Sequence, residues 1–205
     1  MKEKETIASR IRENISRFHR GKIFFAEDFL DLGGINTVRR NLARIAEEKD
    51  SGVLRIANGV YLKPKTDETF GFDVLYPSLH DLSMKIAQQR GIRLAPTYET
   101  ALNILHLSTQ VQTNTVFLTN GSDAKIKTLY LGEGEIRFEH CGDKRVFRFK
   151  NTVMQMIYLA MKFLGRDGIS EDNTKRIRDI YYRIPVDVRK LDDMHFVSWM
   201  KKAIQ

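Results

Sequence analysis

The chain has 205 residues, of which 42% are hydrophobic and 29% are charged, a composition typical of a globular protein with one large domain or two small ones. Its one cysteine, Cys141, excludes an internal disulfide framework and fits a reducing cytoplasm. The formal net charge of +8 favours an anionic partner, which by charge alone can be nucleic acid, a membrane surface or an acidic protein.

The basic residues are concentrated near the N-terminus. Residues 1–65 hold 14 lysines and arginines against 9 aspartates and glutamates, a net charge of +5. Residues 66–150 hold 10 of each kind, and residues 151–205 hold 10 against 7, a net charge of +3. We therefore expect an anionic partner mainly at the first third of the chain.

Neither a secretory signal nor a membrane partner is expected. The first ten residues, MKEKETIASR, are charged and contain no apolar run of the kind found in signal peptides. The most apolar run, VMQMIYLAMKFLG at 153–165, contains Gln155 and Lys162 and is too short to cross a bilayer. These features predict a cytoplasmic protein.

The first predicted elements are a helix, a short strand and a second helix. Residues 4–19 carry one apolar stripe at helical spacing, made of Ile7, Ile11, Ile15 and Phe18. Residues 22–25 are β-prone, and residues 26–32 again have apolar residues at helical spacing. Gly33 and Gly34 end the second helix, because glycine tolerates the left-handed conformation that a helix C-terminus often needs.

A third helix is predicted over residues 36–48, with Asn36 as its N-cap because an asparagine side chain can accept a hydrogen bond from a first-turn N–H. Its apolar positions recur at helical spacing and are expected to face a core: Val38, Leu42 and Ile45. The opposite face and its flank are polar and mostly basic: Thr37, Arg39, Arg40 and Arg44. Such a face is either an ordinary solvated surface or a surface for an anionic partner.

A β-hairpin is predicted over residues 53–64, VLRIANGVYLKP. Both central residues of a type I′ turn need a positive φ, and Asn58-Gly59 meets that requirement best. The order helix, short strand, helix, glycine turn, helix and hairpin is that of a winged helix-turn-helix, with Asn58-Gly59 at the tip of the wing. We therefore assign residues 1–65 to a winged helix-turn-helix DNA-binding domain.

A second domain of the α+β class is predicted over residues 72–205, after a polar linker from Lys63 to Gly71. It is expected to begin with helices at 79–90 and 97–106 and to continue with strands at 116–119, 125–131, 135–141 and 145–149. Three further helices form a C-terminal tail, at 152–164, 171–183 and 186–204. The fold class predicted for the chain is therefore α+β.

The surroundings of the basic helix favour DNA over a plain solvated surface. A helix that follows a glycine turn and precedes a hairpin is placed as a recognition helix in the major groove. Arginine can donate to guanine O6 and N7, asparagine can pair with adenine, and phosphates attract cations in any sequence. Bases or flanking phosphates are expected to meet Asn36, Thr37, Arg40 and Arg44. Contacts to the DNA backbone are expected from Lys22, Arg39 and the wing at Asn58 and Gly59.

No metal site, cofactor or enzymatic activity is expected. None of the histidines has a partner at metal-ligand spacing: His19, His80, His106, His140 and His195. His140 and Cys141 are neighbours on a predicted strand, so their side chains should point to opposite faces. Asp123-Ala124-Lys125 resembles the D-x-K element of metal-dependent nucleases, but we find no well-placed acidic partner for it. Ser108 and Thr109 lack a nucleophile motif, and no glycine-rich phosphate loop is present.

The C-terminal tail carries a second group of cations on one predicted helix: Lys175, Arg176, Arg178 and Arg183. A solvated helix face is the first interpretation of this group, and a further DNA-contacting surface is the second. The aromatic residues of the tail are interpreted as helix-packing residues rather than as a platform for stacked bases: Tyr181, Tyr182, Phe196 and Trp199.

Two blocks of sequence resemble the AbiEi-like antitoxins, the regulatory halves of abortive-infection type IV toxin–antitoxin pairs. The first is AEDFLDLGGINTVRRNLARI followed by GVLRIANGVYLKP, which is similar to the winged helix of that family. The second is ETALNILHLSTQV (99–111) followed by NTVFLT (114–119), which is similar to the signature of its second domain. The blocks cover most of residues 20–120, and the family usually carries glycine where this chain has His106.

The resemblance implies a transcriptional regulator that represses its own operon by binding double-stranded DNA at the operator. It also implies an antitoxin that opposes a nucleotidyltransferase-like toxin encoded beside it, without requiring direct contact. A competing interpretation is a protein-interaction module that uses the winged helix to bind a partner protein. A metal-dependent nuclease is the third. A basic third helix favours DNA, because protein-binding winged helices often have a neutral or acidic one.

Overall fold

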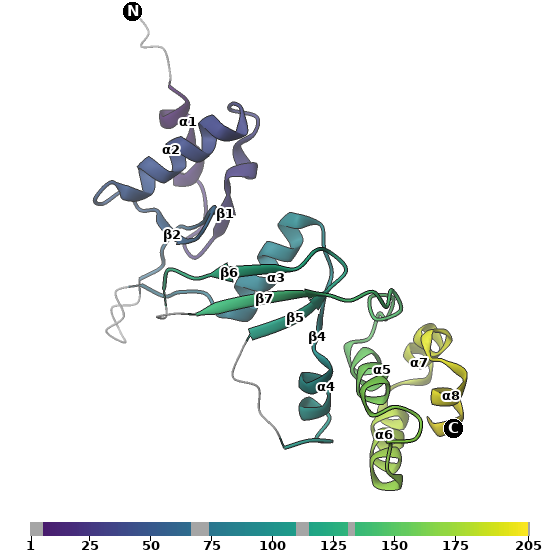
Figure 1. Ribbon diagram of the computed structural model, residues 1–205. Helices are drawn as coiled ribbons and strands as arrows, with labels where there is room; N and C mark the ends of the chain where they lie inside the picture. Colours follow the sequence, from purple (N-terminus) through teal and green to yellow (C-terminus); the bar gives the residue numbers. More distant parts are fainter. Residues whose placement is uncertain (1–5, 67–73, 110–114, 131–133, 205) are drawn as a thin grey trace, which may run out of the picture. The chain divides into compact units, whose positions relative to one another are not determined.

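The computed structural model describes residues 6–66, 74–109, 115–130 and 134–204, which form a mixed α+β protein with two small β-sheets (Figure 1). The chain divides into two compact units. The N-terminal unit comprises residues 1–90 and 126–136, and the C-terminal unit comprises residues 91–125 and 137–205. Residues 67–71 of the expected linker lie outside the described residues. In the described part of the chain, no helix is both long enough and apolar enough to cross a membrane.

The N-terminal unit contains the elements predicted for the first 62 residues, in the predicted order. They are α1 (Ile7–Ser16), β1 (Ile23–Phe25), the 3-10 helix η1 (Ala26–Phe29), α2 (Ile35–Glu47), β2 (Leu54–Ala57) and β3 (Val60–Leu62). Helix α3 (Leu79–Arg90) follows, as predicted. Helix α1 begins where Thr6 caps it, since the Thr6 hydroxyl oxygen accepts from the Ser9 N–H at 3.2 Å.

The three strands of this unit form an antiparallel sheet in the order β1-β3-β2. Helices α1 and α2 contribute their apolar faces to one core with this sheet, and the residues of the core include Ile11, Ile15, Phe24, Phe29, Val38, Leu42, Ile45 and Tyr61. Three of these rings lie together: Phe24 is 5.9 Å from Phe29 and 5.8 Å from Tyr61, centroid to centroid. Each such side chain contributes about 1.5–3 kcal/mol through burial. This burial fixes which face of α2 points outward.

Three local predictions in the N-terminal unit are wrong. The second helix is a 3-10 helix that ends at Phe29, and neither Gly33 nor Gly34 has the left-handed backbone expected of a helix end. Asn36 is not the N-cap of α2, because Gly34 is extended (φ −62°, ψ 146°) and the helix starts at Ile35, which leaves Asn36 inside the first turn with no capping role. The hairpin turn is not of type I′, because Gly59 has a positive φ of 73° and Asn58 does not. The register of the β2–β3 pairing shifts between Arg55 and Ala57, next to this turn.

Lys63, which we assigned to the linker, is instead part of the N-terminal unit. Its backbone continues the β1–β3 pairing, since the Lys63 N–H donates to the Lys22 carbonyl at 2.9 Å and its carbonyl accepts from the Gly21 N–H at 2.7 Å. Its ammonium donates to three carbonyl oxygens at the end of α1, those of Ile15, Ser16 and Phe18. The side chain therefore ties β3 to the C-terminus of α1.

The remaining strands and helices follow the α+β class predicted for the second part of the chain. The strands are β4 (Leu94–Pro96), β5 (Thr115–Thr119), β6 (Ala124–Lys127) and β7 (Glu135–His140), in the sheet order β4-β5-β7-β6. The helices are α4 (Tyr98–Ile104), α5 (Thr152–Leu164), α6 (Glu171–Arg183), α7 (Val186–Asp192), the 3-10 helix η3 (Asp193–His195) and α8 (Ser198–Ile204). Helices α5 and α6 have the predicted bounds.

Three predictions for the second part of the chain are wrong, and one strand was missed. The strand expected over 125–131 is β6, which ends at Lys127. Residues 145–149 are not a strand but a series of turns, in which the neighbours Val146 and Phe147 are both buried, so the strand alternation fails. The helix predicted over 186–204 is broken into three, with Asp192 turned fully inward at the first break. Strand β4 was not predicted, because it has only three residues and ends in Pro96 at the sheet edge.

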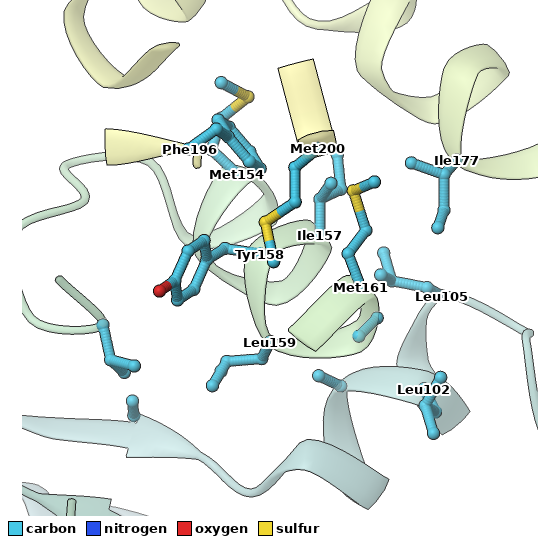
Figure 2. Packing of buried hydrophobic residues seen from close by; sticks show 14 of the residues in the cluster. Leu102, Leu105, Met154, Ile157, Tyr158, Leu159, Met161, Ile177, Phe196 and Met200 are labelled. Carbon is cyan, nitrogen blue, oxygen red and sulfur yellow. The ribbon is translucent and has the colours of Figure 1, made fainter. Parts of the chain in front are cut away.

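The core of the C-terminal unit is built around α5, as Figure 2 shows. Met154, Ile157, Tyr158 and Met161 of α5 form one cluster with Leu102 of α4, Ile177 of α6 and Met200 of α8, and with Leu105 and Phe196, which each follow the end of a helix. Helices α4, α6 and α8 therefore share one core with α5. As predicted, Tyr181 and Phe196 are buried and Trp199 packs against the same cluster. The prediction is wrong for Tyr182, which is 54% exposed.

Candidate nucleic-acid interface

One face of α2 is exposed and basic. Val38, Leu42 and Ile45 are 0% exposed, so the opposite side of this helix faces solvent. The exposed residues there include five of the eight that were predicted to contact DNA: Asn36, Thr37, Arg39, Arg40 and Arg44. We call these five residues the α2 face. The α2 face carries three positive charges and no carboxylate of its own.

The three arginines of the α2 face differ in what holds them. Arg39 Nη2 lies 2.8 Å from Glu27 Oε1 of η1, an exposed ion pair. Arg44 donates to Asn41 Oδ1 at 3.3 Å. The Arg40 side chain forms no hydrogen bond or ion pair with the residues that the structure describes, in contrast to Arg39 and Arg44. An exposed ion pair contributes only about 0–1 kcal/mol, so Arg39 can exchange Glu27 for another anion, and Arg40 needs no exchange at all.

The hairpin adds a cation that the sequence analysis missed. Arg55 is exposed on β2 and donates to Asn58 Oδ1 at 2.8 Å, which holds the asparagine side chain at the exposed turn. Gly59 is half-buried beside it. The signal was present in the sequence, because Arg55 stands between Leu54 and the buried Ile56 in a strand pattern.

A buried tyrosine, Tyr61, lies within electrostatic range of both the hairpin cation and the α2 face. Burial raises the pKa of Tyr61, while the positive charges of Arg55 and Arg39 oppose that rise. Both guanidinium groups therefore act on the same phenol, one from β2 and one from α2. Arg55 is also the register partner of Tyr61 in the β2–β3 pairing, which places the hairpin cation beside this residue.

Lys22 stands apart from the α2 face. It precedes β1, is half-buried, and its ammonium lies 3.3 Å from the ring centroid of Phe18. A cation over a ring gains about 0.5–1 kcal/mol at such a site. Contact between Lys22 and a phosphate would compete with this interaction.

A cavity of about 550 Å³ holds the D-x-K element. Asp123 and Lys125 line it together with Glu139, an acidic neighbour from β7 that the sequence analysis did not find. Asp123 Oδ1 already accepts from the His140 N–H at 2.5 Å. Within the described ranges, no three or more His, Cys, Asp or Glu residues are grouped so that they could hold a metal ion.

The histidines and the nearby hydroxyl residues have local roles or lie at the surface. His140 is exposed and Cys141 is buried, but β7 ends at His140 and both residues line one cavity, so the two side chains do not show the strand alternation that was predicted. His195 packs edge-on against Phe149 at 5.3 Å. His106 has φ 56°, in the left-handed region that favours glycine. Ser108 is half-buried and Thr109 is exposed.

The basic residues of the tail lie on α6, in the C-terminal unit. Ile177 and Tyr181 are buried, whereas Lys175, Arg176, Arg178 and Arg183 are exposed. Arg178 Nε donates to the Ala203 carbonyl at 2.8 Å, which ties α6 to α8. Arg189 lies over both Tyr181 and Tyr182, at 4.7 and 4.9 Å. At least part of this basic helix therefore has a structural role.

Comparison with known proteins assigns a family and no activity. A family of unknown function (DUF6088) matches residues 10–187, a range that includes residues of both compact units. No curated protein and no solved structure matches the chain.

Proposed function

We propose that this chain, which belongs to the DUF6088 family, is a DNA-binding transcriptional regulator whose N-terminal unit is a winged helix-turn-helix. The α2 face carries the proposal. It places Asn36, Thr37, Arg40 and Arg44 on one side of a 13-residue helix whose other side is buried. The order α1, β1, η1, α2, β2 and β3 supports the proposal, because it is the element order of winged helices.

In the proposed mechanism, α2 occupies the major groove. The groove is about 12 Å wide and accepts an α-helix. Arg40 and Arg44 lie four residues apart, so they are neighbours on one helix face and can donate to adjacent base edges or phosphates. Arg39 leaves Glu27 for a phosphate, and Arg55 with the Asn58-Gly59 turn approaches the backbone beside the groove. Repression follows from occupancy of the operator and needs no chemical step.

The most direct test is the binding of Arg40→Ala and Arg44→Ala to duplex DNA from the region upstream of the protein's own operon. An arginine that reads a base contributes about 1–3 kcal/mol, which is about 5- to 150-fold in affinity. Fluorescence anisotropy at several salt concentrations measures this loss together with the number of phosphates contacted. Neither residue is buried, so the free energy of unfolding should change by no more than about 0.5 kcal/mol.

Arg10→Ala is the matched control, because Arg10 is an exposed arginine on α1, outside the α2 face. It removes the same charge and should leave the affinity for the operator within about twofold. If Arg40→Ala and Arg44→Ala bind the operator as tightly as Arg10→Ala, the α2 face is not the DNA-binding surface. Binding of a partner protein that these variants abolish would then favour the interaction module.

We further propose that the regulator is the antitoxin of a type IV toxin–antitoxin pair and represses that operon. The resemblance of the two sequence blocks supports this role, and so does the left-handed backbone of His106 at a position where the AbiEi-like family usually carries glycine. Co-expression with the gene encoded beside it tests the role. Growth restored by the chain, when the neighbour alone arrests growth, is the expected result. Growth that stays arrested would leave a regulator without antitoxin activity.

A metal-dependent nuclease is a second candidate, because Asp123, Lys125 and Glu139 line one cavity. The function that we propose needs no metal, so duplex DNA incubated with the protein and Mg²⁺ or Mn²⁺ should stay intact. Cleavage that disappears in both Asp123→Ala and Glu139→Gln would establish the nuclease instead. Cleavage that survives both substitutions would come from a contaminating enzyme.

A further inference from the structure

A cation-lined cavity of about 360 Å³ lies in the C-terminal unit, apart from the α2 face. Its walls come from the start of β4, the end of β5 and the segment after β7. The charged side chains that line it are Arg93, Lys144 and Arg148. No aspartate or glutamate is among its lining residues, in contrast to the cavity that contains Asp123 and Glu139. The arrangement favours an anion.

The segment CGDKRVFRFK, residues 141–150, supplies most of these cations. Buried residues and side-chain hydrogen bonds fix its backbone. Val146 and Phe147 are buried, while Lys144, Arg145, Arg148 and Lys150 are exposed. The turns between them are fixed by side-chain hydrogen bonds: Arg93 Nη1 donates to the Phe147 carbonyl at 2.5 Å, and Gln155 Nε2 donates to the Val146 carbonyl at 2.8 Å. The backbone of this segment is therefore ordered before a ligand binds, so that binding orders only the exposed side chains.

The one carboxylate of this segment is already occupied. Asp143 Oδ2 accepts from the Tyr158 hydroxyl at 2.6 Å and from Lys162 Nζ at 2.5 Å, and Asp143 Oδ1 accepts from the Arg145 N–H at 3.0 Å. Burial raises the pKa of Tyr158 to about 12, so the phenol stays protonated and remains a donor. Asp143 therefore holds the segment on α5 and is not available to neutralise Lys144 or Arg148.

The donors that remain in the cavity match a tetrahedral oxyanion. Arg93 spends one N–H on the Phe147 carbonyl, and a guanidinium has five N–H donors in a planar fork. His140 Nδ1 donates to the Gly121 carbonyl at 2.7 Å, so His140 spends its ring proton on the protein, and the donors for a ligand come from the arginines and Lys144. Phe147 and Cys141 add apolar surface to the wall. A volume of this size is within the range of small-molecule sites.

We propose that this cavity is a binding site for a phosphate group, held by Arg93, Lys144 and Arg148. The phosphate can belong to a free nucleotide or to the backbone of a nucleic acid. The site lies within the C-terminal unit and does not depend on DNA binding by α2.

Isothermal titration calorimetry of the full-length protein with ATP, inorganic phosphate and adenosine tests the site. We expect one ATP per chain, weaker binding of phosphate, and no binding of adenosine, which lacks the phosphate. Arg148→Ala and Lys144→Ala should each weaken ATP binding by about tenfold or more, because each removes a charge-assisted hydrogen bond. Both side chains are exposed, so their loss should not unfold the protein.

Arg166→Ala is the matched control, since Arg166 is an exposed arginine of the same unit and does not line the cavity. It should change the affinity for ATP by no more than about twofold. The proposal is overturned if neither ATP nor phosphate binds in a saturable manner. It is also overturned if Arg166→Ala weakens binding as much as Arg148→Ala does.

Duplex DNA separates the two sources of the phosphate group. If the duplex displaces ATP and Arg148→Ala weakens the binding of both, the site holds a phosphate of the nucleic-acid backbone. If duplex binding is unchanged in Arg148→Ala while ATP binding falls, the ligand is a free nucleotide. Arg40→Ala should retain ATP binding in either case. ATP binding by Arg40→Ala distinguishes a failure of the DNA-binding proposal from a failure of the phosphate-site proposal.

Discussion

Lys63→Met should destabilise the N-terminal unit selectively, because the Lys63 ammonium holds the end of α1. Its three N–H donors point at three carbonyl oxygens, those of Ile15 (3.1 Å), Ser16 (2.8 Å) and Phe18 (2.7 Å). Carbonyls in the last turn of a helix have no partner within the helix, and they carry the negative end of its dipole. Methionine keeps an apolar stem of similar length and removes only the charge and the donors.

The expected loss is about 2–4 kcal/mol. A hydrogen bond to a charged group contributes about 1.5–3 kcal/mol when it stands alone. Three bonds to one ammonium do not add, since the group is desolvated only once and part of the site is exposed. A cation at a helix C-terminus contributes about 0.3–1 kcal/mol, and up to about 2 kcal/mol when partly buried. Together these values place the loss above the scale of a surface substitution.

Amide hydrogen exchange of α1 is the suitable assay. The one tryptophan, Trp199, lies in the C-terminal unit, so its fluorescence does not report on α1. A loss of 2–4 kcal/mol lowers the protection of the buried α1 amides, such as those of Ile11 and Ile15, by about 30- to 1,000-fold. Lys65→Met is the matched control, because Lys65 is exposed and two residues away. Equal protection in the two variants would show that the ammonium does not stabilise the end of α1.

Two further substitutions test how the segment 141–150 is anchored. Asp192→Asn should cost about 2–4 kcal/mol, because the fully buried carboxylate accepts from the Lys150 N–H (2.9 Å) and the Asn151 N–H (2.8 Å) at the start of α5. Urea unfolding followed by Trp199 fluorescence measures this cost, with the exposed Asp187→Asn as control. Asp143→Asn should destabilise the protein most at neutral pH. Burial alone would raise the pKa of Asp143, but the hydrogen bonds from Lys162 and Tyr158 lower this pKa below its ordinary 3.8. A carboxylate with a lowered pKa stabilises the fold above that value, so the difference from wild type should shrink as the pH falls below about 4, and a constant difference would contradict this assignment.

The elements that were predicted correctly are those whose signals are local. Helices α5 and α6 have the predicted bounds because Asn151 and Ser170 cap them, each accepting from an N–H three residues later. The α2 face was predicted for a similar reason. A spacing of four and three residues between Val38, Leu42 and Ile45 determines which side of the helix is buried, and hence which side is exposed.

The elements that were missed depend on contacts between distant parts of the chain. Residues 145–149 have strand-like composition, but Arg93 and Gln155 take up two of their carbonyls and hold them in turns. The helix predicted over 186–204 breaks at a residue whose carboxylate is needed at the start of α5, some 40 residues earlier. No local pattern distinguishes Asp192 from Asp193 in this respect.

In the candidate sites, too, the residues of one element were predicted and those from other elements were missed. Five of the residues predicted to contact DNA lie together on α2, because all five belong to one helix. Arg55 joins them through space, from a strand that pairs with β3, and Glu139 joins Asp123 and Lys125 from another strand of the second sheet. Periodicity shows which face of an element a residue occupies. It does not show which faces of different elements meet.

The contacts between distant segments also determine which fragment of the chain is suitable for DNA-binding experiments. Polarity alone places the end of the winged helix near residue 65, at the start of the predicted linker. The compact unit nevertheless includes residues 126–136. These residues pair with the outer edge of β2, where the Leu129 N–H donates to the Ile56 carbonyl at 2.8 Å and Ala57 forms a bridge with Thr128. A fragment cut at residue 66 would leave this edge unpaired beside the turn at Asn58-Gly59. Unpaired strand edges associate with other chains. Weak DNA binding by such a fragment would therefore have two explanations, an incomplete N-terminal unit or a wrongly assigned DNA-binding surface. Single substitutions on α2 in the full-length chain avoid this ambiguity.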